Sequence, residues 1–157
     1  MEKILKILEN NARISVEEIA AMTGFSMEEI ARRIDEYRKA NIITGYKTLV
    51  NWEKTKVEHV QALIELKVSP KRDCGFDEIA ARIACFDEVD SVMLMSGGYD
   101  LSLMMTGKSF QDIALFVARR LSPLDDVLST ATHFVLRTYK KDGVLFNVEH
   151  TDERELQ

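Results

Sequence analysis

The stretch VDSVMLMSGGYDLSLMMT, residues 89–106, decides the fold of the second half of this chain. Two apolar runs, 89–95 and 101–106, flank a loop that begins at Ser96 and contains two glycines. Apolar runs of this length on either side of a glycine-containing loop are typical of two neighbouring antiparallel strands. The loop also carries a tyrosine and an aspartate, whose hydroxyl and carboxylate groups a plain hairpin turn does not require.

On each side of this strand pair the sequence predicts a helix and a further strand. Residues 60–68 alternate apolar and polar side chains, as a strand does, and residues 76–84 repeat apolar side chains at helical spacing. After the pair, Ser109 precedes a second helix, and residues 127–139 form the last strand. The order βαββαβ predicts a ferredoxin-like domain, a four-stranded antiparallel sheet with both helices on one face. The expected fold class is α+β.

The predicted strands carry apolar side chains on both faces, unlike an antiparallel sheet with one face in water. Met93 and Met95 have one parity, while Val92 and Leu94 have the other. A second copy of the same sheet is the simplest cover for the open face. We therefore expect an obligate dimer that associates further, with the methionines as interface filler and not as a metal or redox site.

The first fifty residues predict three short helices. Ser15 and Ser26 each precede a glutamate three residues on, which is the capping-box signature of a helix start. Gly24 lies between them and suits the left-handed end of a helix. Helices are thus expected over 15–22 and 27–40, after an N-terminal amphipathic helix. Three helices with a glycine-containing turn describe an N-terminal helix-turn-helix unit, although a helical hairpin that binds nothing has the same outline.

Two further features favour DNA as the partner of this unit. Residues 41–50 surround Gly45 with apolar side chains and are expected to form a linking strand that leaves the helices. Basic side chains, which reach phosphates and guanine edges, gather on the third helix. The predicted contacts to double-stranded DNA are Ser26, Met27, Arg32, Arg33, Arg38 and Lys47.

The charge of the chain argues against strong DNA binding. The chain has a net charge of −5, and residues 1–50 hold eight Lys and Arg against eight Asp and Glu. We expect Arg32 and Arg33 to pair with Glu28 and Glu29, at about 0.2–0.5 kcal/mol per pair, which a phosphate can outcompete. A neutral unit predicts modest non-specific affinity, so specific binding has to rely on base contacts and dimer symmetry.

Residues 2 to about 140 resemble the leucine-responsive/asparagine regulator (Lrp/AsnC) family of transcription regulators. The resemblance implies an effector-binding and dimerisation domain, rings of dimers up to tetramers or octamers, and a small effector, usually an amino acid, bound between dimers near the glycine loop. The motifs that carry the resemblance are NNARISVEEIAAMTGFS, RRIDEYRKANIITGYKTLVNW, LMSGGYDL and LSTATHFVL.

The glycine loop suits an amino-acid effector. Gly97 and Gly98 let backbone N–H groups approach a carboxylate, Asp100 can pair with an ammonium, and Tyr99 offers a flat wall with a hydroxyl. The alternative is a tight hairpin in which Asp100 bonds only to its own backbone. By resemblance, two threonines of the last strand complete the site from a neighbouring subunit. The predicted effector residues are Ser96, Gly97, Gly98, Tyr99, Asp100, Thr130 and Thr132.

The sequence departs from the family before its last strand. Where relatives resembling this chain carry Pro-Gly-Val, it has Asp125-Asp126-Val127, an acidic pair that either selects a cationic effector or is only a solvated turn. Two other classes of protein remain open. One is an amino-acid sensor without strong DNA binding, and the other is an enzyme resembling haem-precursor decarboxylases. The three histidines lie apart without a nucleophile at motif spacing, so we expect no catalytic residue, cofactor or metal.

The expected domains are a helix-turn-helix unit with its linking strand at 1–50, a linker at 51–59, the ferredoxin-like domain at 60–140 and a tail at 141–157. The tail begins with a turn into a short strand near residue 144, and its remainder has a disordered composition. The two cysteines, Cys74 and Cys85, are expected to be reduced thiols. With no signal peptide or apolar span, the protein is expected in the cytoplasm, away from membranes.

Overall fold

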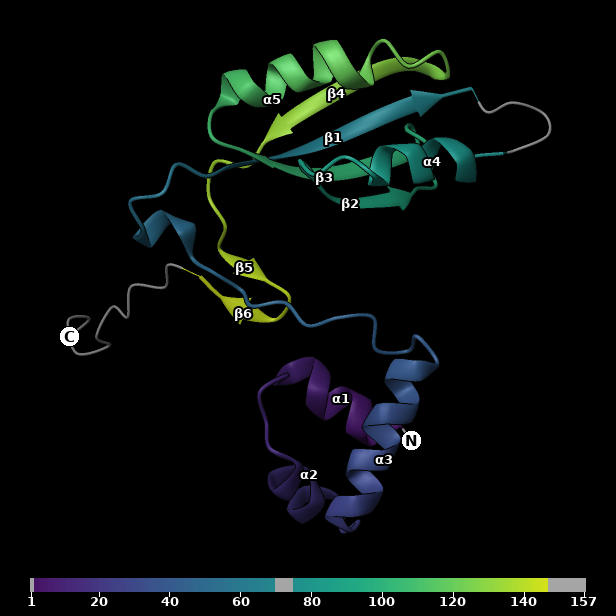
Figure 1. The fold of residues 1–157 in the computed structure, drawn as a ribbon. Helices are drawn as coiled ribbons and strands as arrows, with labels where there is room; N and C mark the ends of the chain where they lie inside the picture. The colour runs from purple at the N-terminus through teal and green to yellow at the C-terminus, as the bar shows by residue number, and fades with distance from the viewer. Residues whose placement is uncertain (1, 70–74, 147–157) are drawn as a thin grey trace. The chain divides into compact units, whose positions relative to one another are not determined.

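The computed structural model describes residues 2–69 and 75–146, and the chain divides into two compact units, Met1–Leu49 and Val50–Gln157. The first unit contains three helices, α1 (Glu2–Asn10), α2 (Val16–Thr23) and α3 (Met27–Lys39) (Figure 1). Their apolar faces meet in one small core, as the helical spacing predicts. The buried residues of this core are Ile4, Leu8, Ile19, Ile30 and Tyr37.

The helix ends follow the predicted caps with one correction. The Ser15 hydroxyl accepts from the Glu18 N–H and the Glu18 carboxylate accepts from the Ser15 N–H, which is a complete capping box. Gly24 ends α2 at φ 77°. Ser26 caps α3 by accepting from the Glu29 N–H, but the Glu29 carboxylate binds Arg33 instead of closing a second box. The prediction of two complete boxes was therefore wrong for the second.

The linking strand predicted at 41–50 is not formed within one copy of the chain, where these ten residues, all described, contain no strand. A strand needs a neighbour to pair with, and a single copy of this unit offers none. The chain then makes one 3₁₀ turn, Trp52–Lys54, in the second unit. The Trp52 ring stacks on His59 with 4.8 Å between ring centroids, immediately before the sheet begins.

The second unit has the predicted ferredoxin-like topology. Its sheet has the order β2-β3-β1-β4 with every neighbour antiparallel. β4 ends at Phe134, five residues before the predicted end and close to the start of β1 at Val60, and one further hydrogen bond joins the Val135 N–H to the Gln61 carbonyl. A further hairpin follows, whose turn residues Asp142 and Gly143 have φ of 46° and 82°. The elements are β1 (Val60–Val68), α4 (Asp77–Ala84), β2 (Val89–Leu94), β3 (Leu101–Gly107), α5 (Phe110–Phe116) with a π-type turn (Val117–Leu121), β4 (Val127–Phe134), β5 (Lys140–Lys141) and β6 (Val144–Leu145).

The two faces of the sheet differ more than the sequence predicted. On one face Ile64, Leu66 and Leu103 are fully buried in a single cluster with Ile83 of α4 and Ile113 of α5, so both helices cover this face. The cross-strand register places Leu63, Glu65 and Lys67 of β1 on the other face, opposite Met104, Ala131 and His133 among others.

The open face is therefore mixed and not simply apolar. The Glu65 carboxylate lies 3.0 Å from the His133 Nε2, between apolar neighbours from β1 and β3. The alternation predicted for residues 60–68 is confirmed, and it places Glu65 and Lys67 on the open face beside the apolar side chains that β2 and β3 contribute. A surface with charged pairs among apolar side chains has the composition of an interface and not of a core.

Candidate nucleic-acid interface and glycine-loop site

The turn between α2 and α3 presents an exposed apolar edge. Met22, Phe25 and Met27 are 54%, 37% and 46% exposed around the left-handed Gly24. Along α3 the exposed stripe continues from Met27 and Glu28 to Ala31 and Arg32. In helix-turn-helix proteins the N-terminal residues of the second helix of the motif meet base edges. The corresponding positions of this chain are therefore open to a partner.

Arg33 is held against the turn. Its Nε and one terminal nitrogen lie 3.0 and 2.6 Å from the same Glu29 carboxylate oxygen, and its guanidinium lies 4.5 Å from the centre of the Phe25 ring. The Glu29 carboxylate raises the pKa of Arg33 above its ordinary value. Most of this side chain is covered, so it braces Phe25 and the first turn of α3. The predicted Arg33–Glu29 pair is confirmed.

The predicted Arg32–Glu28 pair is wrong. Arg32 pairs with Glu36, one turn further on, and both side chains are more than half exposed. Both glutamates are four residues from Arg32, so spacing alone cannot choose between them. At the start of α3, its own N–H and Ser26 lower the pKa of Glu28. Ser26 also caps the helix by accepting from the Glu29 N–H.

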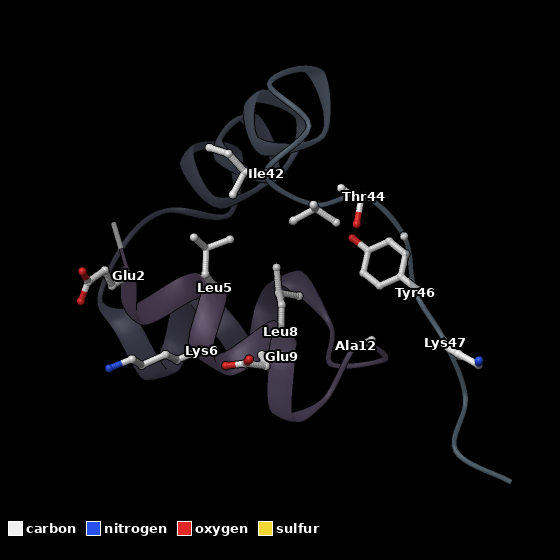
Figure 2. Close-up of a pocket in the computed structure, with 12 residues that line it drawn as sticks. Glu2, Leu5, Lys6, Leu8, Glu9, Ala12, Ile42, Thr44, Tyr46 and Lys47 are labelled. Carbon is white, nitrogen blue, oxygen red and sulfur yellow. The ribbon is translucent and has the colours of Figure 1, made fainter. Parts of the chain in front are cut away.

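Lys47 lines a groove that the sequence did not indicate, and Arg38 contacts Tyr46, which also lines it. The Arg38 guanidinium lies 5.5 Å from the Tyr46 ring centre and donates a 3.2 Å hydrogen bond to the Tyr46 hydroxyl. The groove has a volume of about 470 Å³. Figure 2 shows Leu5 and Leu8 of α1 on one side of it and Ile42 and Tyr46 on the other. The apolar residues predicted as a linking strand form one wall of this groove, because they lie back against α1.

The glycine loop is fastened to the central strand β1 through Asp100. The Asp100 N–H donates to the Leu66 carbonyl at 2.9 Å, and its own carbonyl accepts from the Met95 N–H at 2.8 Å. One carboxylate oxygen accepts from the Val68 N–H at 2.9 Å, and the other lies 3.3 Å from the Lys67 Nζ. The Val68 hydrogen bond, more than Lys67, lowers the pKa of Asp100. This side chain therefore holds the loop at the end of the sheet.

The two glycines of the loop differ in their backbone. Gly97 has φ +146°, a conformation that residues with a side chain rarely adopt, whereas Gly98 has no such restriction. A Cβ atom at either position would meet no other atom within 4 Å, so both face open space. Ser96, Gly97 and Gly98 are exposed, and Tyr99 is half-buried. The loop therefore offers an open run of backbone groups beside an anchored carboxylate.

Within one chain the two threonines do not meet this loop. Thr130 pairs with Leu66 of β1, and Thr132 pairs with Ile64, so both lie toward the helix-covered face. Leu66 in turn pairs with Leu101, the first residue after the loop. Thr130 thus lies at the loop's end of the sheet but two strand spacings away, about 10 Å. The structure brings Ser96 to Asp100 together and leaves Thr130 and Thr132 apart from them.

The two acidic residues before β4 differ in exposure. Asp125 is exposed, whereas Asp126 is buried and its carbonyl accepts from the Ser69 N–H at 2.9 Å. Over residues 2–69 and 75–146 no three His, Cys, Asp or Glu side chains are placed to hold a metal ion. Cys85 is a free, exposed thiol, and Cys74 lies outside the described residues. None of the helices in the described part of the chain has the length and apolar character to cross a membrane.

Family models match both units of the chain. One, described as the AsnC-type helix-turn-helix domain, matches residues 2–38, and the other, described as the Lrp/AsnC ligand binding domain, matches residues 61–145. The chain is 47% identical over 153 residues to the HTH-type transcriptional regulator YugG of Bacillus subtilis (strain 168), an alignment that covers 97% of this chain and 92% of that protein.

Two solved structures similar to the chain have the same two-part fold. Escherichia coli AsnC superposes with a TM-score of 0.67 at 25% identity, covering 88% of this chain and 91% of that one. The transcriptional regulator NMB0573 of Neisseria meningitidis, in a complex with L-Met, superposes with a TM-score of 0.71 at 25% identity, covering 88% and 89%.

Proposed function

The chain belongs to the Lrp/AsnC family of DNA-binding transcription regulators, and on that premise we propose that a small effector, an amino acid, controls its DNA binding. The family and the relatives are regulators and not enzymes, which removes the decarboxylase alternative. A regulator of this kind acts in the cytoplasm, where its DNA lies. Its partners are then duplex DNA, the effector and further copies of the same chain.

The exposed stripe that runs along α3 from the α2–α3 turn carries the proposal for sequence-specific binding. Met27, Glu28, Ala31 and Arg32 face outward from a scaffold whose caps and core are complete. A helix presented in this way fits the major groove, where each base pair has a distinct pattern of donors and acceptors. Arg32, Arg38 and Lys47 supply cations for phosphates, and Ser26 and Arg33 hold the start of the helix in place.

Selection from a pool of random duplexes tests this part of the proposal. The protein is expected to enrich a two-fold symmetric sequence, because a symmetric dimer presents two copies of α3 to two half-sites. Enrichment of no sequence at all would favour the alternative, an amino-acid sensor whose helix-turn-helix unit binds no specific DNA. The equal numbers of acidic and basic residues in residues 1–50 are the observation that favours this alternative.

The glycine loop supports the effector part of the proposal. Open backbone at Gly97 and Gly98 suits a carboxylate, and a carboxylate such as Asp100 has about four acceptor positions, of which Val68 and Lys67 occupy two. An ammonium is expected to take a third. The similar regulator NMB0573 is described in complex with L-Met, so methionine is the first amino acid to test.

Calorimetric titration with each of the twenty amino acids tests this part. One or more is expected to bind the parent protein, and Asp100→Asn should weaken that binding at least tenfold, because the ammonium loses a charged acceptor. If Asp100→Asn binds as the parent does, Asp100 serves only to anchor the loop to β1.

A neighbouring copy of the chain is proposed to complete the effector site and to cover the open sheet face. Within one chain Thr130 is about 10 Å from the loop and Thr132 lies further along β4, so a contribution from them has to come from another subunit. Light scattering at micromolar concentration is expected to give at least twice the 17.9 kDa of one chain. A stable monomer would contradict the shared site.

A further inference from the structure

Glu28 is an unusual side chain at the exposed start of a helix that faces DNA. Its carboxylate is negative, and the arginine four residues further on pairs with Glu36 instead. The next glutamate, Glu29, is neutralised by Arg33. Glu28 therefore keeps its charge in the first turn of α3, with exposed Met27 and Ala31 beside it.

The start of α3 favours the ionised form of this carboxylate. Its own N–H and Ser26 keep the pKa of Glu28 below the ordinary value. The exposed carboxylate is thus an ionised acceptor at neutral pH. Ser26 already caps α3 through the Glu29 N–H, so the cap does not require the Glu28 side chain.

A carboxylate in the major groove has only one good partner among the base edges. Cytosine presents an N4 amino donor, whereas guanine presents two acceptors and adenine presents an acceptor beside its donor. A carboxylate also repels the phosphates of any duplex that gives it no donor, which lowers non-specific affinity. Both effects increase discrimination between DNA sequences and lower the affinity for DNA in general.

We propose that Glu28 is a specificity-determining residue that accepts a hydrogen bond from the amino group of a cytosine at one position of each half-site. The inference rests on the proposed DNA-binding function and adds the base that one side chain reads. The exposed methyl groups of Met27 and Ala31 flank this contact, and apolar contacts of this kind suit thymine at the adjoining positions.

Substitution of Glu28 by glutamine tests the assignment because it changes the hydrogen-bonding groups of the side chain and nearly keeps its size and shape. A Gln amide both donates and accepts, and it pairs with the N6 and N7 of adenine. Glu28→Gln should therefore move the selected base from cytosine to adenine at one position, with a change in relative affinity of about tenfold or more. Glu28→Ala should remove the preference at that position without creating another.

The experiment is selection from a random duplex pool, followed by sequencing, for the parent, Glu28→Gln, Glu28→Ala and Glu9→Gln. Glu9 is exposed on α1, so its variant makes the same charge change away from the predicted readout and should select as the parent does. Circular dichroism melting of each variant verifies that the helices are folded.

The outcomes separate this inference from the proposed function. A cytosine that becomes adenine only in Glu28→Gln, with every other position unchanged, supports the assignment. A selected sequence that is identical for the parent and both Glu28 variants overturns it while leaving sequence-specific binding intact. If the parent enriches no sequence, the proposed function fails and this inference fails with it.

Discussion

The two candidate sites differ in how far apart their residues lie in the sequence. The α2–α3 surface comes from one continuous stretch, in which helical spacing alone places Met27, Ala31 and Arg32 on one stripe. The glycine-loop site joins segments that are more than thirty residues apart, and within one chain it is only partly assembled. A site of the first kind can act in a single chain, whereas a site of the second kind depends on assembly.

The largest expected effect tests whether the two sites lie in separately folding units. Ile19 is fully buried in the small helical core, and Ile19→Ala should destabilise the first unit by about 2–5 kcal/mol. DNA binding should be lost, while the sheet unit keeps its amino-acid binding. Calorimetric melting and hydrogen exchange measure the two units separately. Simultaneous melting of both units at the lowered temperature would show that the sites are not independent.

The second effect distinguishes the two glycines of the loop. Gly97→Val forces a side chain into the φ +146° conformation and should cost about 1–3 kcal/mol of stability or change the loop, with loss of effector binding. Gly98→Val has no such backbone penalty and is the matched control for stability. Thermal melting and calorimetric titration of both variants provide the measurement. Equal destabilisation by the two substitutions would contradict the strained backbone at Gly97.

The third effect is a pH dependence that belongs to the sheet unit. Because the folded structure lowers the pKa of Asp100, its stabilising contribution is complete above the ordinary carboxyl pKa and is lost as pH falls through the lowered value. Denaturant titrations of the parent between about pH 2 and pH 6 should show this loss, and Asp100→Asn should reduce it. The exposed Asp125→Asn is the control. If the parent and Asp100→Asn lose the same stability at low pH, Asp100 is not the group responsible for that loss.

The smallest effect separates the two neighbouring arginines of α3. Arg32→Ala should lower the slope of log affinity against log salt by about one, because an exposed cation meets a phosphate, and should change stability by only a few tenths of a kcal/mol. Arg33→Ala should instead lower the melting temperature, since Phe25 and Glu29 lose their partner. If Arg33→Ala alone changes the salt slope, their roles are reversed.

Local signals in the sequence predicted much of this structure. The cap at Ser15, the left-handed Gly24, the buried side of α3 and the order of the six sheet-domain elements all depend on neighbours within a few residues. The same signals predicted the cluster Ser96–Asp100, because it is one loop. Its hydrogen bond to Val68 could not be predicted, since that bond joins residues 32 positions apart through the pairing of strands.

Three features could not be predicted from the sequence, each for a different physical reason. Arg32 had two glutamates at equal spacing, and it pairs with Glu36, whereas Glu28 lies at the helix start, where its pKa is lowered. The linking strand had apolar residues but no strand to pair with, so it became the wall of the groove against α1. The proximity of Glu65 to His133 on the open sheet face depends on a cross-strand register that residue spacing does not contain.

The central claim is that the α3 surface recognises a DNA sequence, and one equilibrium measurement tests it most directly. Fluorescence anisotropy compares binding of the parent protein to the selected duplex and to a shuffled duplex of the same composition, at one physiological salt concentration. Sequence recognition by base contacts predicts that the selected duplex binds about a thousandfold more tightly. Equal affinity for the two duplexes would contradict the claim, because phosphate contacts alone cannot distinguish them.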